Sequence, residues 1–533
     1  MRQGILVAWI VASVLGIGAA GCSGDDSLIQ TDQSGRPDVL AEVLVDAVRD
    51  AGDVGLRDSG GDSAFEIPGE WDIDEDARGD DSGDASTDST PDLLDDTGQS
   101  VDDDGAENGG LDTGVDVVSF CVSFEDCSDD EVCEFSLGRC QKRGTWTDTA
   151  TAVYGYHPAA ATVGDNLVID GTVLCQQAMM GCTGGRVKIG SVALSGFSVP
   201  TDENRMIVKV TAAMKGIVTV YDAAGKGVSL PTPFMQAPTG VLECDGSTPA
   251  ASGVPGISPR HVGPFAAGYV DLDDELGTRV FYPAQCGSIR RPPVTDAVWP
   301  LVMIMHGNGA LYMNHEHLAQ LLATWGFVSV MPSTLMNMAG DPQGADDLIA
   351  QVMPLVQRVR GKDLAAEHPV LSGVLTSEDV VWVGHSRGSG RSEELIGADS
   401  DLAAHTKGGI FLGPVDDGMP VPGMLIVFGA GHDLQSGSLS YNAPYRDHDG
   451  PKWLVEIPGG NHGSFCDHKV YGYGSLGTMF GDAKPDISRH QQLEIVQTFG
   501  LPFVQRAFGG DELFSGLLDS PPSDTMYKIV HAN

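Results

Sequence analysis

The stretch DVVWVGHSRGSG, residues 379–390, decides the fold of the C-terminal half of this 533-residue chain. Its apolar run, residues 380–383, has the length and composition of a buried strand, and residues 389–395 continue as the start of a helix. Between them lies GHSRG, residues 384–388, a G-x-S-x-G motif. Such a turn between a strand and a helix is typical of a nucleophilic serine, because its strained backbone and close packing admit only small residues at the two glycines. We therefore expect Ser386 to be a nucleophile at the carboxyl end of a strand.

The region 263–533 repeats this alternation of apolar strands and amphipathic helices. Continuous apolar strands separated by helices indicate a mostly parallel sheet with helices on both faces, so the predicted fold class is α/β. The whole chain is too long for one compact core, and we expect further modules before this region. The predicted strands are residues 279–283, 299–307, 327–333, 379–386, 408–414, 423–430 and 452–459, and the predicted helices include residues 314–326 and 346–361.

Candidate catalytic residues follow several of these strands, at the edge where open α/β sheets bind ligands. Asp433 and His462 follow the last two predicted strands, so Ser386, Asp433 and His462 occur in the chain order of a Ser-Asp-His triad. The backbone N–H groups of Asn308, after an earlier strand, and of Arg387 are the predicted oxyanion-hole donors. These five residues form the predicted site.

Neighbouring residues leave alternatives open. Asp416 or Asp417 could supply the acid from the preceding strand, and His468 or His432 could supply the base. Cys466 could be a rival nucleophile, but it has no strained turn and no base of its own, so a buried thiol is the expectation.

The sequence also predicts some features of the surroundings of this site. We expect His306 and His385 to orient or pack rather than to catalyse. Only about ten residues, 414–423, join two of the strands, which leaves no room for a helical cap and predicts an open site. The side chain of Arg387 could meet an acidic substrate, but pairing with a surface carboxylate is favoured.

Four stretches of the C-terminal region resemble successive blocks of one branch of the α/β-hydrolase superfamily, which holds dienelactone-hydrolase-like, chlorophyllase-like, platelet-activating-factor-acetylhydrolase-like and polyester-hydrolase or cutinase-like enzymes. The resemblance runs from Gly263 to near Gly510. It departs from the family at Arg387, where an apolar residue is usual, and at residues 389–390, where a further glycine is common. The stretches are GPFAAGYVDLDDELGTRVFYPA (263–284), VMIMHGNGALYMNHEHLAQLLATWGFVSVMPS (302–333), VVWVGHSRGSG (380–390) and KWLVEIPGGNHGSF (452–465).

This resemblance implies an α/β-hydrolase sheet and a serine hydrolase that cleaves a small-molecule or polymeric carboxylic ester through an acyl-enzyme. It implies the triad Ser386, Asp433 and His462, the donors Asn308 and Arg387, and neither a metal nor an organic cofactor. Two other functions stay open: a surface binding or adhesion protein whose hydrolase fold is inactive, and a peptidase or amidase of the same fold.

The N-terminus has the pattern of a bacterial secretory signal. A charged start leads into the apolar residues 5–17, which are too few to span a membrane comfortably. The ending AAGC resembles a lipobox, with alanine at position 19 where leucine is usual. The resemblance implies a signal peptide over residues 1–21 and a lipid anchor at Cys22. By resemblance to lipoprotein sorting in well-studied bacteria, Ser23 in place of aspartate favours the outer membrane of the cell envelope as the place of attachment.

An acidic segment, residues 22–118, follows the signal. Residues 23–118 contain 29 Asp and Glu, four Arg and no Lys, which is −25 of the chain's net charge of −43. A segment so acidic and poor in aromatic residues cannot bury enough apolar surface to fold, so we expect a disordered stalk and no nucleic-acid partner. A short helix over residues 39–48 and calcium binding by DIDED (72–76) or VDDDG (101–105) are alternatives within it, although neither acidic run has the ligand spacing of a calcium loop.

Cysteine use predicts an oxidising compartment. Four cysteines in a small module, residues 119–145, favour two disulfides whose pairing order the sequence does not reveal. Zinc binding by these four cysteines is the weaker interpretation, because no two of them have two-residue spacing and no histidine is near. Two further disulfides are expected, and Cys466 is left over. The cysteines concerned are Cys121, Cys127, Cys133 and Cys140 in the module, and the expected pairs Cys175 with Cys182 and Cys244 with Cys286.

Residues 150–237 alternate short apolar runs with turns, which predicts a small antiparallel β-sandwich. The stretch AVYGYHPAAATVGDNLVIDGTVL, with the later GGRVKIGSVAL, resembles the start of an immunoglobulin-like IPT/TIG domain, which implies a spacer or binding module. His157 in this stretch is expected in a turn or at the surface. Residues 238–262 are the predicted linker to the catalytic domain.

Overall fold

The computed structural model describes most of the chain from residue 120 onward. The chain divides into two units, residues 1–108 and 109–533, and every described residue belongs to the second. The predicted signal peptide, Cys22, the stalk and its alternatives therefore lie outside the described residues. Among the described residues, no helix is long and apolar enough to cross a membrane. The described residues are 120–532 except 145–149, 175, 179–180, 184, 195–204, 212–213, 223, 308–311, 334–344, 416–419, 435–441, 468–482, 511–512 and 515.

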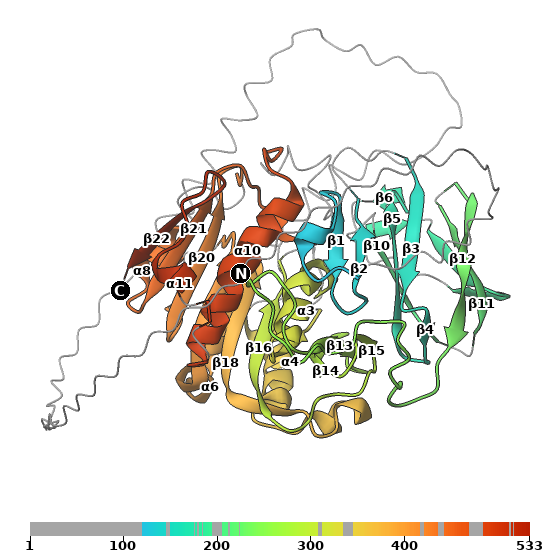
Figure 1. The fold of residues 1–533 in the computed structure, drawn as a ribbon, viewed down its shortest axis with the longest axis horizontal. Coiled ribbons are helices and arrows are strands. Elements are labelled where there is room, and N and C mark those ends of the chain that lie inside the picture. The colour runs from blue at the N-terminus through green and yellow to red at the C-terminus, as the bar shows by residue number, and fades with distance from the viewer. Residues whose placement is uncertain are drawn as a thin grey trace, which may run out of the picture. The chain divides into compact units, whose positions relative to one another are not determined.

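A ten-stranded, mostly parallel sheet dominates the described chain (Figure 1). Its strands β17, β16, β18, β19, β20 and β21 are parallel neighbours, while β13, β14 and β22 join by antiparallel pairing. The predicted mixed α/β class is thereby confirmed. In spatial order the strands are β15 (Ser288–Ile289), β13 (Ala266–Asp271), β14 (Arg279–Ala284), β17 (Val328–Met331), β16 (Val298–Met305), β18 (Leu375–His385), β19 (Thr406–Leu412), β20 (Met424–Ala430), β21 (Lys452–Ile457) and β22 (Lys528–Ala532).

The order of the parallel strands reverses at β16. Val302 on β16 pairs with Ser329 on β17 on one side and with Val381 on β18 on the other. After β16 the chain forms β17 on one side of it, and then crosses to form β18 on the other side. From β18 it continues away from β16 to β19. In open α/β sheets, ligands bind at the carboxyl ends of the strands beside such a reversal, here β16 and β18.

Helices cover both faces of the sheet because successive strand residues point to opposite sides. On β18, Val381 and Val383 belong to one apolar cluster, which also holds residues of α3 (Glu316–Thr324) and α10 (Arg489–Ala507). Val380 and Trp382 belong to the other cluster, with residues of α4 (Ala345–Val359) and α5 (Arg387–Ala398). The near-continuous apolar strands read from the sequence are thus buried on both faces. The shorter helices are α6 (Ser400–His405), α8 (Asn442–Asp447) and α11 (Gly516–Asp519).

Two smaller sheets precede this fold and share one apolar core. Leu167 and Ile169 from the first sheet belong to the same cluster as Val218 and Val220 from the second. The short strands expected between residues 150 and 237 are therefore present. The first sheet has the order β10 (Arg205–Lys209), β5 (Asn166–Thr172) and β3 (Ala152–His157), the second has the order β4 (Ala160–Ala161), β12 (Gly227–Gln236), β11 (Gly216–Tyr221), β8 (Arg186–Ile189) and β9 (Val192–Leu194), and β6 (Gln176–Ala178) pairs with β7 (Gly181–Thr183).

The cysteine-rich segment consists of η2 (Phe124–Asp126) and a hairpin of β1 (Glu131–Glu134) and β2 (Arg139–Lys142), which lies beside α3 in Figure 1. Its four cysteines form two disulfides, as predicted, so none of them is a thiolate that could ligate zinc. The expected pair of Cys244 and Cys286 is also bonded, whereas Cys175 lies outside the described residues. The two disulfides of the segment join Cys121 to Cys133 and Cys127 to Cys140.

A buried ionic cluster joins these three parts of the chain. Arg205 on β10 has no solvent exposure, and its guanidinium donates to Asp170 on β5, Glu316 on α3 and Glu134 on β1, each at 2.9 Å. Burial alone would raise the pKa of Glu134, but Arg143 and Arg205 lower it to about 2. Because a buried charge is tolerated only when it is closely paired, these contacts hold the cysteine-rich hairpin, the smaller sheets and the large sheet against one another.

His157 belongs to this cluster, which corrects the expectation of a turn or surface histidine. It ends β3 with 2% exposure, and its Nε2 lies 3.5 Å from Asp170 Oδ2. The sequence around His157 is a turn signal because a proline follows it, but the ring is enclosed by Asp170 on the neighbouring strand β5 and by Arg205, which is 48 residues away in the chain.

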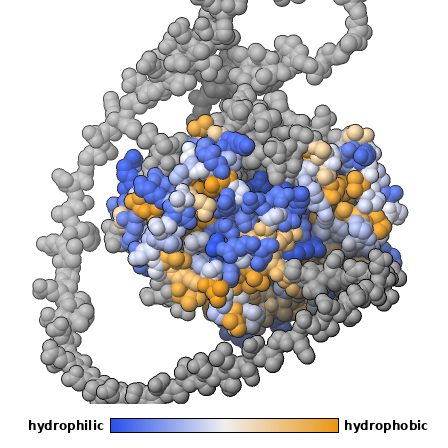
Figure 2. All heavy atoms as spheres, turned by 45° about the horizontal axis from the view of Figure 1, so that its top comes forward, coloured by the Kyte–Doolittle hydropathy of each residue, from blue (hydrophilic) through white to orange (hydrophobic). Residues whose placement is uncertain are grey.

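The surface of the described residues mixes polar and apolar areas. Figure 2 shows a broad hydrophilic area near the centre of the face toward the viewer, with hydrophobic patches around it. Val254 and Ile257, two of the most exposed large apolar residues, lie in the predicted linker.

Candidate active site

Ser386 lies in a strained turn directly after β18 and before α5. Its φ of 54° and ψ of −127° are unusual for any residue with a side chain. Strain of this kind costs about 1–3 kcal/mol and persists only where the surroundings hold it. The Ser386 N–H donates to the carbonyl of Leu412 on β19 at 2.9 Å, and the Ser389 N–H donates to the Ser386 carbonyl at 3.0 Å. Strand, turn and helix thus occur where the GHSRG motif predicts them.

The two glycines of the motif are required by close packing, as expected. A Cβ at Gly384 would lie 2.5 Å from the Cα of Ser389, and a Cβ at Gly388 would collide with the carbonyl of Met305 on β16. Gly307, which follows β16, is equally close: its Cβ would lie 2.9 Å from the Cβ of Ser386. Ser386 therefore lies at the ends of β16 and β18, where the strand order reverses.

Asp433 and His462 form a buried hydrogen-bonded pair at the same edge of the sheet. Asp433 follows β20 and His462 follows β21, and His462 Nδ1 lies 2.8 Å from Asp433 Oδ2, with both side chains fully buried. A carboxylate oxygen can only accept, so Nδ1 carries the proton and the lone pair of Nε2 can act as a base. The structure thus brings together the acid and the base that the sequence predicts.

The serine turn and the acid–base pair converge through the residues between them. The ring of His385, next to Ser386 in the chain, lies against the ring of His462 with centroids 4.8 Å apart. Gly413, one residue after β19, faces the pair: a Cβ there would lie 2.9 Å from His462 Nδ1 and 3.1 Å from Asp433 Oδ2. Three strand ends at one edge of the sheet, those of β18, β20 and β21, supply the three residues of the predicted triad.

His385 and His306 are buried, as expected of packing residues. Burial, with the nearby His462 as the second cause, lowers the pKa of His385 well below its ordinary value, so the ring is neutral. Its Nε2 lies 3.3 Å from the carbonyl oxygen of His462 and donates to it. His306 places Nδ1 2.9 Å from the carbonyl oxygen of Gly307. His385 therefore supports the backbone of the predicted base.

Several predicted residues are not described. Asn308, the second expected oxyanion donor, lies outside the described residues, as do the alternative acids Asp416 and Asp417 and the alternative base His468. Arg387 is the half-buried first residue of α5, so its backbone N–H lies at the helix N-terminus beside Ser386. Whether the site is open, as the short connection over residues 414–423 predicts, depends in part on residues 416–419 and stays a prediction.

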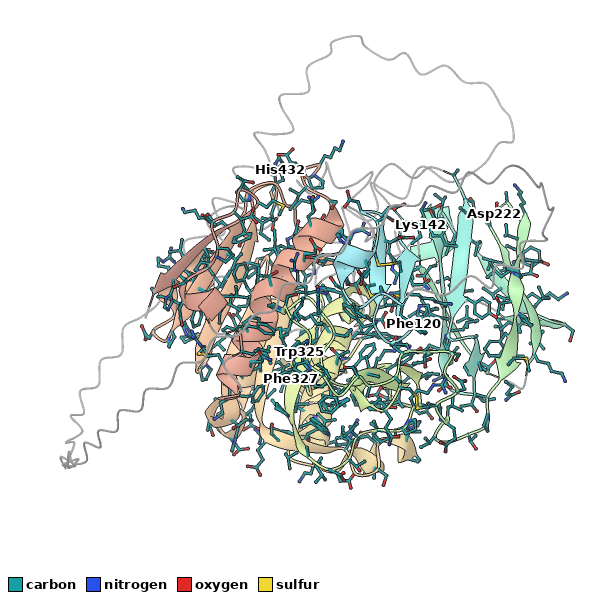
Figure 3. The ribbon with its side chains drawn as sticks, viewed as in Figure 1. Phe120, Lys142, Asp222, Trp325, Phe327 and His432 are labelled. Atoms are coloured by element: carbon teal, nitrogen blue, oxygen red, sulfur yellow. A yellow bond between two sulfur atoms is a disulfide. The ribbon has the colours of Figure 1, made fainter. Side chains whose placement is uncertain are left out.

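The other two rivals, His432 and Cys466, have contacts of their own. His432 lies beyond the end of β20 (Figure 3), where its Nε2 is 2.9 Å from Asp486 Oδ2 and its side chain is about a third exposed. Cys466 is buried, as expected, but its Sγ lies 3.7 Å from His385 Nδ1, so the expectation that no base is near this thiol is wrong. Neither residue takes part in the pair that Asp433 forms with His462.

Asn461 and Gln492 position the predicted base, and neither was predicted from the sequence. The Asn461 N–H donates to Gln492 Oε1 at 3.0 Å, and Gln492 Nε2 donates back to the Asn461 carbonyl at 2.8 Å. The Asn461 side chain accepts from the Ser464 N–H at 2.9 Å, which closes the turn around His462. Only the position of Asn461 next to His462 could have drawn attention to it, because Gln492 is far away in the sequence.

No protein family is recognised by comparison. A scan against models of protein families finds no match, and a search among curated proteins finds no significant one. The function is therefore inferred from the geometry of this site.

Proposed function

We propose that this protein is a serine hydrolase of the α/β-hydrolase fold, which cleaves a carboxylic ester through an acyl-enzyme intermediate. The observation that carries the proposal is the buried Asp433–His462 pair, at 2.8 Å, beside the strained turn of Ser386. A strained serine next to a hydrogen-bonded acid and base is an arrangement that nucleophilic catalysis requires, and a purely structural turn would not need it.

In the proposed reaction His462 Nε2 removes the hydroxyl proton of Ser386 while Ser386 Oγ attacks the ester carbonyl carbon. The oxyanion that forms accepts hydrogen bonds from the backbone N–H of Arg387 and, by family resemblance, from that of Asn308. The carbon–oxygen bond to the alcohol breaks, and His462 returns the proton to the leaving alcohol. Water, deprotonated by His462, then releases the acid and restores Ser386. Asp433 stabilises the imidazolium in both steps.

The remaining parts are proposed by resemblance. The large sheet would be the catalytic α/β-hydrolase domain, and the two smaller sheets an immunoglobulin-like IPT/TIG domain. The cell-envelope location rests on the predicted signal and lipidation at Cys22. Disulfides among the described residues support an oxidising compartment, because reducing compartments rarely keep them.

Turnover of p-nitrophenyl esters of graded acyl length tests the proposal. Ser386→Ala and His462→Ala should each lower kcat by about 10⁴-fold or more, since removing either member disables the unit. Ser520→Ala and His432→Ala are the matched controls away from the site and should keep wild-type turnover. Full turnover by both Ser386→Ala and His462→Ala would show that the triad is wrongly assigned. Faster cleavage of the matching amides than of the esters would instead indicate a peptidase or amidase.

A further inference from the structure

Three buried side chains with metal-binding atoms lie close together, and one of them, His385, contacts the predicted base His462. His315 ends η3 (Tyr312–His315), His385 ends β18, and Cys466 follows η6 (Gly463–Phe465). One ligand atom from each lies within 4.8 Å of the others, and all three residues are at most 2% exposed. In the proposed hydrolysis none of these side chains contacts the substrate or transfers a proton.

One distance within this cluster is close to that of a tetrahedral zinc site, and the other two have an upper limit of 4.8 Å. Sγ of Cys466 and Nδ1 of His385 are 3.7 Å apart, and zinc bonds of about 2.3 Å to sulfur and 2.0–2.1 Å to nitrogen would separate such atoms by about 3.5 Å. Since no two of the atoms are more than 4.8 Å apart, some point lies within about 2.8 Å of all three, so shifts of about 0.5 Å for the sulfur and up to about 0.8 Å for the nitrogens would complete the bonds.

The ring of His385 is already oriented as a ligand. Its Nε2 donates to the His462 carbonyl oxygen at 3.3 Å, so the proton is on Nε2 and the lone pair of Nδ1 points toward Cys466. Metal-binding histidines commonly donate their second ring N–H to a backbone carbonyl, which fixes the tautomer. The ring of His315 lies against that of His385, with centroids 4.9 Å apart.

The backbone around the other two residues is fixed by Asp467. The Asp467 N–H donates to the Asn314 carbonyl at 2.8 Å, and Asp467 Oδ2 accepts from the His317 N–H at 3.0 Å. Asp467 Oδ1 also contacts His317 Nδ1. These bonds hold the segment of Cys466 against the segment of His315, so the cluster does not depend on one flexible side chain.

We propose that His315, His385 and Cys466 bind one divalent zinc ion, with a solvent molecule as the fourth ligand. Two imidazoles and a thiolate suit an ion of intermediate softness, and Zn²⁺ is such an ion. On binding, the thiol of Cys466 loses its proton to solvent and the sulfur bonds to the ion, with no change of oxidation state. The ion would join the start of α3, the end of β18 and the turn after His462. No sequence motif indicates this site, and the inference goes beyond the proposed hydrolysis.

Metal binding by the full-length protein tests this site without an ester substrate. Purified protein should hold about one equivalent of zinc by elemental analysis. After chelation, added Co²⁺ should give the visible bands of a tetrahedral ion and a sulfur-to-cobalt charge-transfer band in the near ultraviolet. Cys466→Ser should abolish the charge-transfer band, and His315→Gln should lower the zinc content at least tenfold. His432→Ala, which removes a part-exposed histidine outside the cluster, should change neither readout.

The wild-type protein alone can overturn the proposal, so the test does not depend on the variants folding. If it retains no zinc and Co²⁺ gives no sulfur charge-transfer band, the cluster is a thiol–imidazole contact and not a metal site. Metal content that is unchanged in both Cys466→Ser and His315→Gln overturns it equally. Ester turnover plays no part in these readouts, so a failure here is distinguishable from a failure of the proposed hydrolase.

Discussion

Replacing Gly413 with alanine should slow ester hydrolysis while leaving substrate binding intact. A Cβ at Gly413 would lie 2.9 Å from His462 Nδ1 and 3.1 Å from Asp433 Oδ2, whereas comfortable contact begins at about 3.5 Å. The His462 ring or the Asp433 carboxylate must therefore move by about half an ångström. Because a misplacement of about 1 Å costs about 100-fold in rate, half that shift predicts a roughly tenfold lower kcat with an unchanged KM.

Gly509→Ala separates this effect from backbone strain. Gly413 has a φ of +52° and Gly509 one of +63°, so alanine strains both, by about 1–2 kcal/mol. Gly509 is exposed, and a Cβ added there would meet no other atom within 4 Å. Urea unfolding should therefore show a loss of stability in both variants, and steady-state kinetics should show a fall in kcat only for Gly413→Ala. Equal kcat in both variants, or a change confined to KM, would refute the reasoning.

Three further predictions concern buried charged side chains. Arg205→Met should lower the free energy of unfolding by about 3–5 kcal/mol, since it leaves three buried carboxylates with one cationic partner fewer. A loss below about 1 kcal/mol in urea unfolding contradicts this. The pKa of Glu134 is about 2 in the folded protein, below its ordinary 4.5, so its contribution to stability is full above pH 4.5 and lost as the pH falls toward 2. The melting temperature of the wild-type protein should fall as the pH is lowered from 4.5 to 2, and that of Glu134→Gln should fall less. Identical pH profiles of the melting temperature for wild type and variant would contradict this role of Glu134. Asp433→Asn should lower kcat for ester hydrolysis by about 10⁴-fold, because the amide favours the wrong tautomer of His462. A loss of less than tenfold in steady-state assays would exclude Asp433 as the acid of the triad.

The large sheet and the serine turn could be predicted because their signals are local. The apolar run before Ser386, the small residues around it and the helix after it are contiguous, and each agrees with the others. Asp433 and His462 were also identifiable, because each directly follows an apolar strand. The strand order, with β17 and β18 on opposite sides of β16, needed the structure, since apolar strands do not say which neighbour they pair with.

The buried ionic cluster could not be predicted, because its members look like surface residues in the sequence. Arg205 lies in a strand with an exposed lysine at its end, and its partners Glu134 and Glu316 are 71 and 111 residues away. His157 was misplaced for the same reason. The contact of Cys466 with His385 spans 81 residues, so neither residue's local sequence could reveal the cluster around them.

Labelling with a fluorophosphonate probe tests the central claim most directly, because the probe reacts only with a serine that its own site has activated. The folded protein with its disulfides intact should carry one adduct, mapped by peptide mass spectrometry to Ser386. Labelling should vanish in Ser386→Ala, fall by orders of magnitude in His462→Ala, and persist in His432→Ala. A folded protein that carries no adduct, or carries it on another residue, would contradict the assignment of Ser386 as the nucleophile.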